Sequence, residues 1–363
     1  MIPDENRFES APAEALPDEV DLPEAWRVEP PDPSDETDVD HLLALLRAQQ
    51  SDGRGWASAT RAEVLLAIGD PGSRVRENVV LRDRDGVIHA WGTVHDRASG
   101  RMLFRHVIDR QLPQADADTA SEALVAWAES QARTVGAARG LASQQIDVEA
   151  FANDERLHKW LEGADFNRVR SWWQMSRPVA ADEASLVPSP ALWDRAGVRF
   201  RLVRRTGDGL PDEGDLHAVH DVLEEAFSDH FNSKAETFDE FLFRLREDLG
   251  HRWDHWWLAE LLDGPHPEPI GALVGTEISG DDPGSYVAYI GVRSAARGRG
   301  VAKGLLRTII ADAAVRGRSH VGLEVDADSP TGAEGLYVSM GWVTKYVSES
   351  WHKEVPVDTA TTR

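Results

Sequence analysis

A glycine- and arginine-rich segment in the C-terminal half carries residue types suited to binding a phosphate group. It reads Ile290-Gly291-Val292-Arg293-Ser294-Ala295-Ala296-Arg297-Gly298-Arg299-Gly300-Val301-Ala302-Lys303. The two glycines at 298 and 300 let a backbone approach a ligand closely, and Arg297 and Arg299 can neutralise a diphosphate. A helix that begins directly afterwards adds free N–H groups at its first turn. The segment predicts a phosphate-binding loop, although its spacing fits neither the P-loop nor the Gly-x-Gly-x-x-Gly pattern.

The elements around this loop must hold it in place. Residues 287–292 are typical of a buried strand, and residues 300–315 have the apolar spacing of a helix with one buried side. A strand over 321–325, a short helix over 331–340 and a last strand over 342–351 follow. The loop is therefore expected between a strand and the N-terminus of a long helix.

The same order of elements is predicted twice along the chain. In each half a strand is followed by two helices, three strands, a helix, a strand, a helix and a strand. Residues 178–190 mix proline, alanine, serine and acid, which is typical of a linker. We expect an acidic, proline-rich arm over 1–24, a first domain over 25–178, a linker over 179–197, a second domain over 198–356 and a tail over 357–363.

Two linked motifs resemble the GCN5-related N-acetyltransferase (GNAT) superfamily. Arg297-x-x-Gly300-x-Ala302 matches the family pattern Gln/Arg-x-x-Gly-x-Gly/Ala. The downstream run from Val325 to Trp342 is similar to the family's Asn-Pro-x-x-Ala-x-x-Leu-Tyr-x-x-x-Gly-Phe stretch. The resemblance implies an α/β fold of two tandem GNAT-like domains, each a mixed, mostly antiparallel sheet flanked by helices.

The resemblance also implies roles for individual residues. Acetyl-CoA would lie between two splayed strands, with its diphosphate on the loop and its pantetheine beside one strand. The cofactor-binding residues would be Ile290, Gly291, Val292, Arg297, Gly298, Arg299, Gly300, Val301, Ala302, Ser329 and Tyr337. The N–H of Val292 would hold the oxyanion, and Tyr337 would protonate the leaving thiolate.

Two departures from the family pattern affect the chemistry. Ser329 stands where the family often has asparagine, so one CoA contact is altered. The strand before the loop begins Gly284-Ser285-Tyr286 and lacks the carboxylate that many members use as a general base. Glu324, Glu277 and Tyr286 remain open as candidates for that role. The segment after the first helix of the second domain usually walls the acceptor site, so Asp229, His230 and Glu236 are predicted acceptor contacts.

The first half lacks the features that bind the cofactor. Its corresponding loop, over 109–118, contains no glycine, and Asp116 and Asp118 would repel a diphosphate. Asp118 is expected to cap a helix that begins at Thr119. The first half is therefore predicted to be a degenerate copy that no longer binds CoA.

The composition of the chain limits the classes of partner it can bind. The chain has 363 residues, a net charge of −24 and no cysteine. Fourteen Asp and Glu against two Arg fall in residues 1–40. Such an acidic chain is poorly suited to binding nucleic acid, and it contains no apolar run that could span a bilayer.

No secretory signal is recognised, so a cytoplasmic location is expected. No metal site is predicted, because His251 and His255 have no evident third ligand.

These features predict an acetyl-CoA-dependent N-acetyltransferase with its active site in the second domain. The acceptor is expected to be a primary amine of a small cationic molecule, because an acidic surface attracts cations. A protein or peptide N-acetyltransferase and a non-catalytic acyl-CoA sensor stay open as alternatives. The chain is expected to be a monomer or a homodimer.

Overall fold

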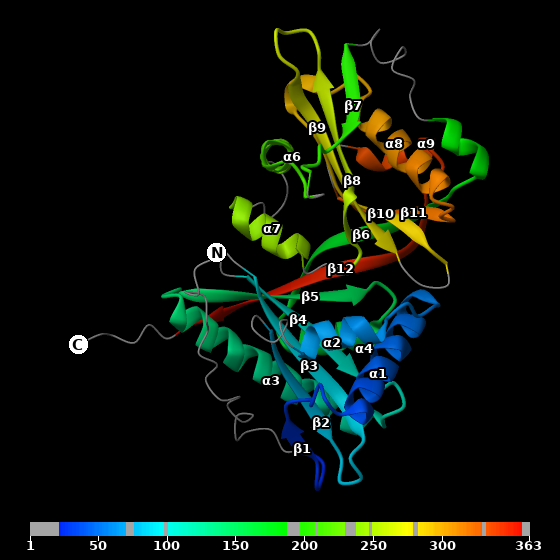
Figure 1. The fold of residues 1–363 in the computed structure, drawn as a ribbon. Helices are drawn as coiled ribbons and strands as arrows, with labels where there is room; N and C mark the ends of the chain where they lie inside the picture. Colours follow the sequence, from blue (N-terminus) through cyan, green and yellow to red (C-terminus); the bar gives the residue numbers. More distant parts are fainter. Residues whose placement is uncertain are drawn as a thin grey trace. The chain divides into compact units, whose positions relative to one another are not determined.

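The computed structural model describes residues 22–69, 76–97, 101–186, 197–207, 210–228, 237–246, 249–278, 282–328 and 332–357. Its chain divides into two compact units. The N-terminal unit consists of Met1–Ser171 together with Tyr346–Arg363, and the C-terminal unit consists of Trp172–Lys345. Both are mixed α/β units with helices on both faces of a mixed sheet, as predicted (Figure 1).

The N-terminal unit contains a sheet in the strand order β1-β2-β3-β4-β5-β12. Its elements are β1 (Arg27–Glu29), α1 (Glu36–Arg54), α2 (Arg61–Ile68), β2 (Arg76–Arg82), β3 (Ile88–Arg97), β4 (Arg101–Ile108), α3 (Gln114–Ala138), β5 (Ser143–Phe151), α4 (Glu155–Gly163) and β12 (Val343–Pro356). Alternate strand residues face opposite cores: Val79 and Leu81 pack with α3, and Val80 packs with α1 and α2.

The C-terminal unit contains a sheet in the order β6-β11-β10-β9-β8-β7. Its elements are the 172–178 part of β6 (Asn167–Pro178), β7 (Val198–Leu202), α6 (Glu213–Phe227), α7 (Phe238–Arg246), β8 (His251–Leu261), β9 (Glu268–Ile278), β10 (Gly284–Val292), α8 (Val301–Val315), β11 (His320–Asp326) and α9 (Ala333–Ser339). Helices α8 and α9 cover one face of the sheet, and α6 and α7 cover the other (Figure 1).

The predicted double order of elements is confirmed. From β1 to β6 and again from β7 to β12, the chain runs strand, two helices, three strands, helix, strand, helix, strand. The predicted start of one helix was wrong. Helix α3 begins at Gln114, directly after Pro113, and not at Thr119. Asp118 therefore lies inside the helix, where its side chain accepts hydrogen bonds from Gln114 and Trp160.

The boundaries between the units differ from the contiguous domains expected from the sequence. The second part of β6, which ends the first half of the sequence, pairs with β11 from Trp172↔Asp326 to Pro178↔His320. The last strand, β12, pairs instead with β5, from Ser348↔Phe151 to Pro356↔Ser143. Each unit is thus completed by a strand from the other half. Both sheets offer an equivalent strand edge with the same alternation, so local sequence could not tell which edge each strand takes.

Among the described residues, no helix is long and apolar enough to cross a membrane.

The exchange of strands predicts which fragments fold. A fragment of residues 197–363 lacks β6, the partner of β11, and β5, the partner of β12. It also lacks Met175, so the core residues that pack against Met175 become exposed. We expect this fragment to show no cooperative thermal transition. The free energy of unfolding of a domain is only about 5–15 kcal/mol, so the loss of a whole strand pairing is enough to unfold it. Residues 172–345 should melt cooperatively in the same circular-dichroism experiment. Equal folding of both fragments would contradict the exchange.

Candidate active site

The predicted phosphate loop connects β10 to α8. After the single 3-10 turn Ser294–Ala296, the backbone takes left-handed conformations at Gly298, with φ of 79°, and at Gly300, with φ of 77°. A Cβ atom at either position would meet no atom within 4 Å, so backbone conformation and not crowding requires glycine. Gly300 is the N-cap of α8 and offers no capping side chain. The N–H groups of the first turn of α8 therefore remain available to an anion.

The loop is positively charged within a strongly acidic protein. Arg297, Arg299 and Lys303 are exposed, and the first turn of α8 contains no acidic residue. The ion pair between Arg299 and Asp263 is long, at 3.8 Å from Nη1 to the carboxylate. This concentration of positive charge beside a helix N-terminus favours a diphosphate.

Strands β10 and β11 separate directly beside the loop. They pair in parallel only from Gly284↔His320 to Val287↔Leu323. Between Val287 and Tyr289 the register of β10 shifts against β9, and beyond this bulge β10 continues along β9 to Val292. Strand β11 meanwhile follows β6 as far as Asp326. The two strands thus diverge, each held by its outer neighbour.

The backbone of β10 faces this divergence at alternate residues. Arg293 N–H donates to the carbonyl of Ile270 at 2.9 Å, which fixes the antiparallel pattern with β9. In that pattern Gly291 points its backbone groups at β9, while Ile290 and Val292 point theirs towards β11. The backbone groups of Ile290 and Val292 are therefore directed to where an extended ligand between the strands would lie.

Gly291 has a packing role instead of facing the ligand. A Cβ at this position would lie 2.8 Å from Cβ of Ala226 and 3.0 Å from Cδ2 of Leu223, both on α6. The absent side chain lets α6 lie close against β10. Gly291 was predicted to contact the cofactor, but its backbone direction and its neighbours place it in the sheet–helix interface.

Tyr337 lies on α9 with 7% of its surface exposed. Burial raises the pKa of its phenol to about 12. The side chain therefore stays protonated at neutral pH and can act only as a proton donor there. Its ring packs edge-on against Trp342, with centroids 6.1 Å apart.

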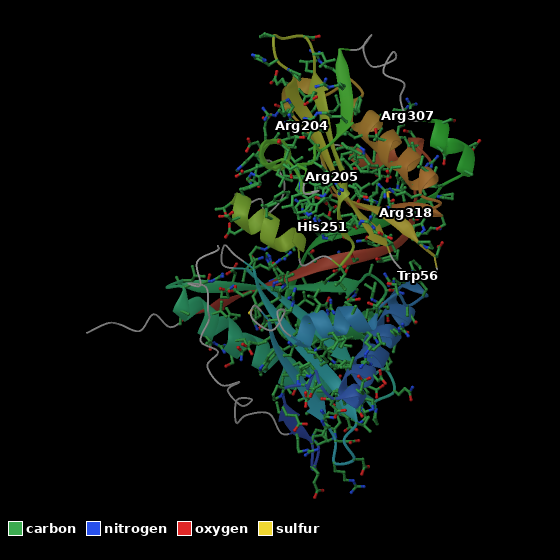
Figure 2. The ribbon with its side chains drawn as sticks, in the orientation of Figure 1. Trp56, Arg204, Arg205, His251, Arg307 and Arg318 are labelled. Carbon is green, nitrogen blue, oxygen red and sulfur yellow. The ribbon has the colours of Figure 1, made fainter. Side chains whose placement is uncertain are left out.

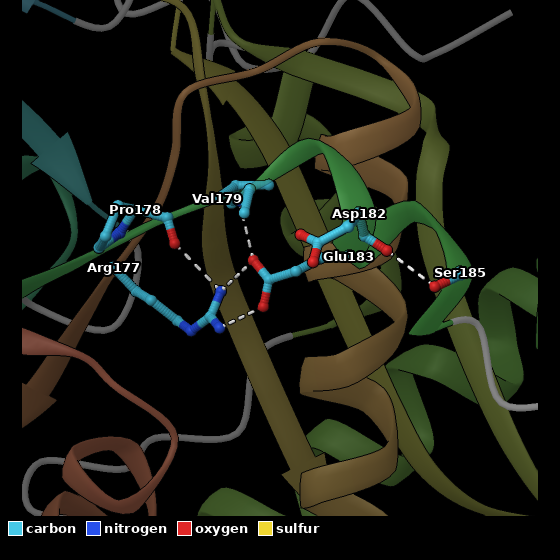
Figure 3. A pocket seen from close by; sticks show the side chains of 7 residues that line it. Arg177, Pro178, Val179, Asp182, Glu183 and Ser185 are labelled. Carbon is cyan, nitrogen blue, oxygen red and sulfur yellow. Dashed lines mark hydrogen bonds and ion pairs between the residues drawn. The ribbon is translucent and has the colours of Figure 1, made fainter.

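A side chain from β6 holds the end of α9. Arg177 Nε donates to the carbonyl of Met340 at 2.7 Å, and its guanidinium lies 5.7 Å from the Trp342 ring centre. The same guanidinium pairs with Glu183 on the short 3-10 helix Ala181–Leu186 (Figure 3). Arg177 and Glu183 line a surface pocket of about 550 Å³ whose lining includes none of the predicted site residues. We assign this pocket a structural role, since its polar groups bind one another.

The three candidate bases have different surroundings. Glu277 pairs with Arg252 at 2.7 Å and with Arg318 at 3.3 Å, so its carboxylate is already bound (Arg318 is labelled in Figure 2). Glu324 instead accepts a hydrogen bond from Gln174, whose Oε1 accepts one from the Tyr286 hydroxyl at 3.4 Å. The structure brings Glu324 and Tyr286 together through Gln174, a residue that sequence analysis missed because it lies in another strand 150 positions away.

Other predicted residues are placed as follows. Asp229, His230, Glu236 and Ser329 lie outside the described residues. His251 and His255 lie on a strand, and His255 is buried between Asp254 and Arg318. Across the described ranges, no group of three His, Cys, Asp or Glu side chains could hold a metal ion.

In the corresponding region of the N-terminal unit, a side chain of the unit itself binds the strand backbone. Strands β4 and β5 also pair only from Arg101↔Gln145 to Phe104↔Val148 and then part. Asp109 N–H donates to the carbonyl of His89, so His106 directs its carbonyl towards β5, as Ile290 does in the other unit. Here Gln49 Nε2 donates to that carbonyl at 2.9 Å.

The loop of the N-terminal unit is closed by an ion pair. Arg110 binds Asp154, the N-cap of α4, through both ends of its guanidinium. Burial opposes ionisation of Asp154, but the hydrogen bond and charge of Arg110 outweigh burial and lower its pKa. Phe166 N–H donates to Leu161 as Trp342 N–H donates to Tyr337, so leucine stands where the C-terminal unit has its tyrosine.

The comparisons with known proteins agree with this geometry. Residues 216–342 match the family described as Acetyltransferase (GNAT) family. The matched segment lies within the C-terminal unit and includes the phosphate loop and Tyr337. No curated protein matches the chain.

Solved structures of GNAT proteins share the fold of the whole chain. A GCN5-related N-acetyltransferase from Sphaerobacter thermophilus is 23% identical with a TM-score of 0.70, covering 93% of this chain and 98% of that chain. A tandem GNAT protein from the clavulanic acid biosynthesis pathway is 13% identical with a TM-score of 0.63, covering 92% and 100%. Saccharomyces cerevisiae N-myristoyltransferase with bound myristoyl-CoA is 10% identical with a TM-score of 0.54, covering 93% and 81%. The predicted fold of two tandem GNAT-like units is confirmed.

The loop geometry of the GNAT domain predicts the effect of Gly300→Asp. An aspartate would add a carboxylate to the diphosphate site and a Cβ to a backbone in the left-handed region. We expect the Kd for acetyl-CoA, measured by calorimetry, to rise by about 100-fold or more. Gly317→Asp is the matched control, because Gly317 has φ of 68° and open space around it at the other end of α8. Similar Kd values for the two variants would contradict a diphosphate at Gly300.

Proposed function

We propose that the C-terminal GNAT domain transfers an acetyl group from acetyl-CoA directly to a primary amine of a small cationic molecule. The observation that carries the proposal is the divergence of β10 from β11, with Ile290 and Val292 facing the gap and the arginine–glycine loop at its end. This arrangement supplies backbone partners for an extended pantetheine arm and an anion site for its diphosphate.

The chain's own residues supply the steps of acyl transfer. The N–H of Val292 stabilises the negative charge that develops on the thioester oxygen. The protonated phenol of Tyr337 gives a proton to the leaving thiolate. With no cysteine in the chain, we propose direct attack by the amine without a thioester on the enzyme.

The charge of the protein supports a cationic acceptor. The net charge is −24, and Glu324 and Asp326 lie at the end of β11, with Asp328 just beyond. Carboxylates at the open end of a diverging strand attract an ammonium group and favour its entry over that of an acidic metabolite. An aminosugar or a polyamine fits this surface.

Replacement of Tyr337 tests the proton donor. Tyr337→Phe should lower kcat by about 10²-fold or more and leave the Kd for acetyl-CoA unchanged, because only the hydroxyl is lost. Since the pKa of Tyr337 is raised to about 12, activity of the unaltered protein should not decline through this group below about pH 11. Tyr289→Phe is the control, since that ring packs with Phe227 and Phe241. An unchanged kcat in Tyr337→Phe would reject Tyr337 as the proton donor. Binding of acetyl-CoA without turnover of any amine by the unaltered protein would instead favour a non-catalytic acyl-CoA sensor.

The filled N-terminal unit predicts the binding stoichiometry. Gln49 occupies the carbonyl of His106, and Arg110 with Asp154 closes the loop, so this unit offers no place for CoA. Titration of the full chain with acetyl-CoA in a calorimeter should give one site per chain. Two sites would show that the side chains in the N-terminal unit rearrange to admit a second cofactor.

A further inference from the structure

Three polar side chains gather on the face of the C-terminal sheet that α6 and α7 cover. Met175, Val287 and Leu323 belong to the core beneath α8. Their neighbours Gln174, Tyr286 and Glu324 therefore point to the opposite face, because successive strand residues alternate. The three side chains come from three adjacent strands, β6, β10 and β11.

The strand register brings these side chains into contact. Gln174 lies directly across from Glu324 in the antiparallel pair β6–β11. Tyr286 is paired with Gly322 in the parallel pair β10–β11. A Cβ on Gly322 would lie 3.0 Å from Cδ2 of Tyr286, so the phenol ring passes over the glycine on its way to β6. Gly322 thus allows a side chain from β10 to reach across β11.

The amide of Gln174 has only one orientation that satisfies both partners. A carboxylate can only accept, so the amide NH₂ donates to Glu324 and its oxygen accepts from the Tyr286 hydroxyl. The Tyr286 proton is therefore directed away from the divergence of β10 and β11. The side chain of Glu324 is exposed on the same face.

We infer that Gln174 is a positioning residue that holds Glu324 as the carboxylate taking the acceptor's proton, while Tyr286 braces Gln174. This inference rests on the proposed function. As the amine nitrogen forms a bond to the thioester carbon, the bond from that carbon to sulfur breaks. The proton leaves the nitrogen for Glu324, the thiolate takes a proton from Tyr337, and solvent restores both groups.

The positioning residue lies outside the segment that matches the GNAT family. That segment covers 216–342, whereas Gln174 belongs to the strand that the first half of the sequence supplies. The first half thus contributes to the chemistry through one exchanged strand, even though its own cofactor site is filled.

The test measures CoA release from the full chain with a thiol reagent. The chain has no cysteine, so the reagent reports CoA alone. Two reactions are measured: acetylation of 1,4-diaminobutane, and hydrolysis of acetyl-CoA by water when no amine is added. Hydrolysis has no amine to titrate, so the acid limb of its pH–rate profile reports the protein's base.

Gln174→Leu removes both hydrogen bonds with little change in size. We expect the kcat of both reactions to fall by about 10-fold and the midpoint of the acid limb to move to higher pH by roughly 0.5 to 1 unit. Gln174→Glu should move that midpoint further, because a second carboxylate opposes ionisation of the first. The Kd for acetyl-CoA should stay within about twofold in both variants, which a general loss of structure would not allow.

Two further variants separate the roles. Glu324→Gln should lower kcat by about 10²-fold or more and abolish the acid limb. Tyr286→Phe should have a smaller effect than Gln174→Leu, since Gln174 still donates to Glu324. Ser176→Ala, on the same face of β6, is the control and should behave as the unaltered protein.

The outcomes distinguish this inference from the proposed function. Acetyl-CoA binding with an unchanged kcat and acid limb in Gln174→Leu or Glu324→Gln overturns the inference alone. If the unaltered protein neither binds acetyl-CoA nor releases CoA above the uncatalysed rate, the proposed function fails and this inference fails with it.

Discussion

The parallel pair β10–β11 cannot be hydrogen-bonded along its whole length and also hold a ligand between its strands. The pairing stops at Val287 and Leu323, where β10 has its bulge. Past this point each strand keeps its geometry only because an outer neighbour holds it: β9 for β10 and β6 for β11. Most other features of the C-terminal unit follow from this divergence. The divergence determines which backbone groups of β10 are left without a partner strand and where the loop begins. It also explains why β11 needs β6 as an outer neighbour.

The two units resolve the same constraint in opposite ways. Both have parallel strands that part after four residue pairs. In the C-terminal unit the exposed backbone at Ile290 and Val292 faces a glycine- and arginine-rich loop. In the N-terminal unit Gln49 satisfies the corresponding carbonyl of His106, and a buried ion pair replaces the anion site. Buried polar groups need partners, and in the N-terminal unit its own side chains supply them.

The exchanged strands join the two halves of the chain, and one of them reaches the proposed site. Strand β6 brings Gln174 beside Glu324 and Arg177 to the end of the helix that carries Tyr337. Both interactions act on the C-terminal unit from a segment outside the family match. The first half therefore supplies a strand whose side chains contact the proposed site residues of the C-terminal unit.

The sequence by itself determined the local features. The periodicity of apolar residues predicted the repeated order of elements, and the glycines, arginines and tyrosine at family spacing predicted the GNAT domain. These predictions succeed because left-handed glycines and amphipathic faces depend on near neighbours along the chain.

Only the tertiary structure decided the pairings between distant strands. It showed that β6 and β12 each pair in the sheet of the other half. It also showed that Gly291 packs against α6, and that Glu277, unlike Glu324, forms ion pairs with Arg252 and Arg318. It also placed Gln174 next to its partners 112 and 150 positions away. Such contacts depend on which sheet edge a strand joins, and both edges offer the same hydrogen-bonding pattern, so no local signal could have distinguished them.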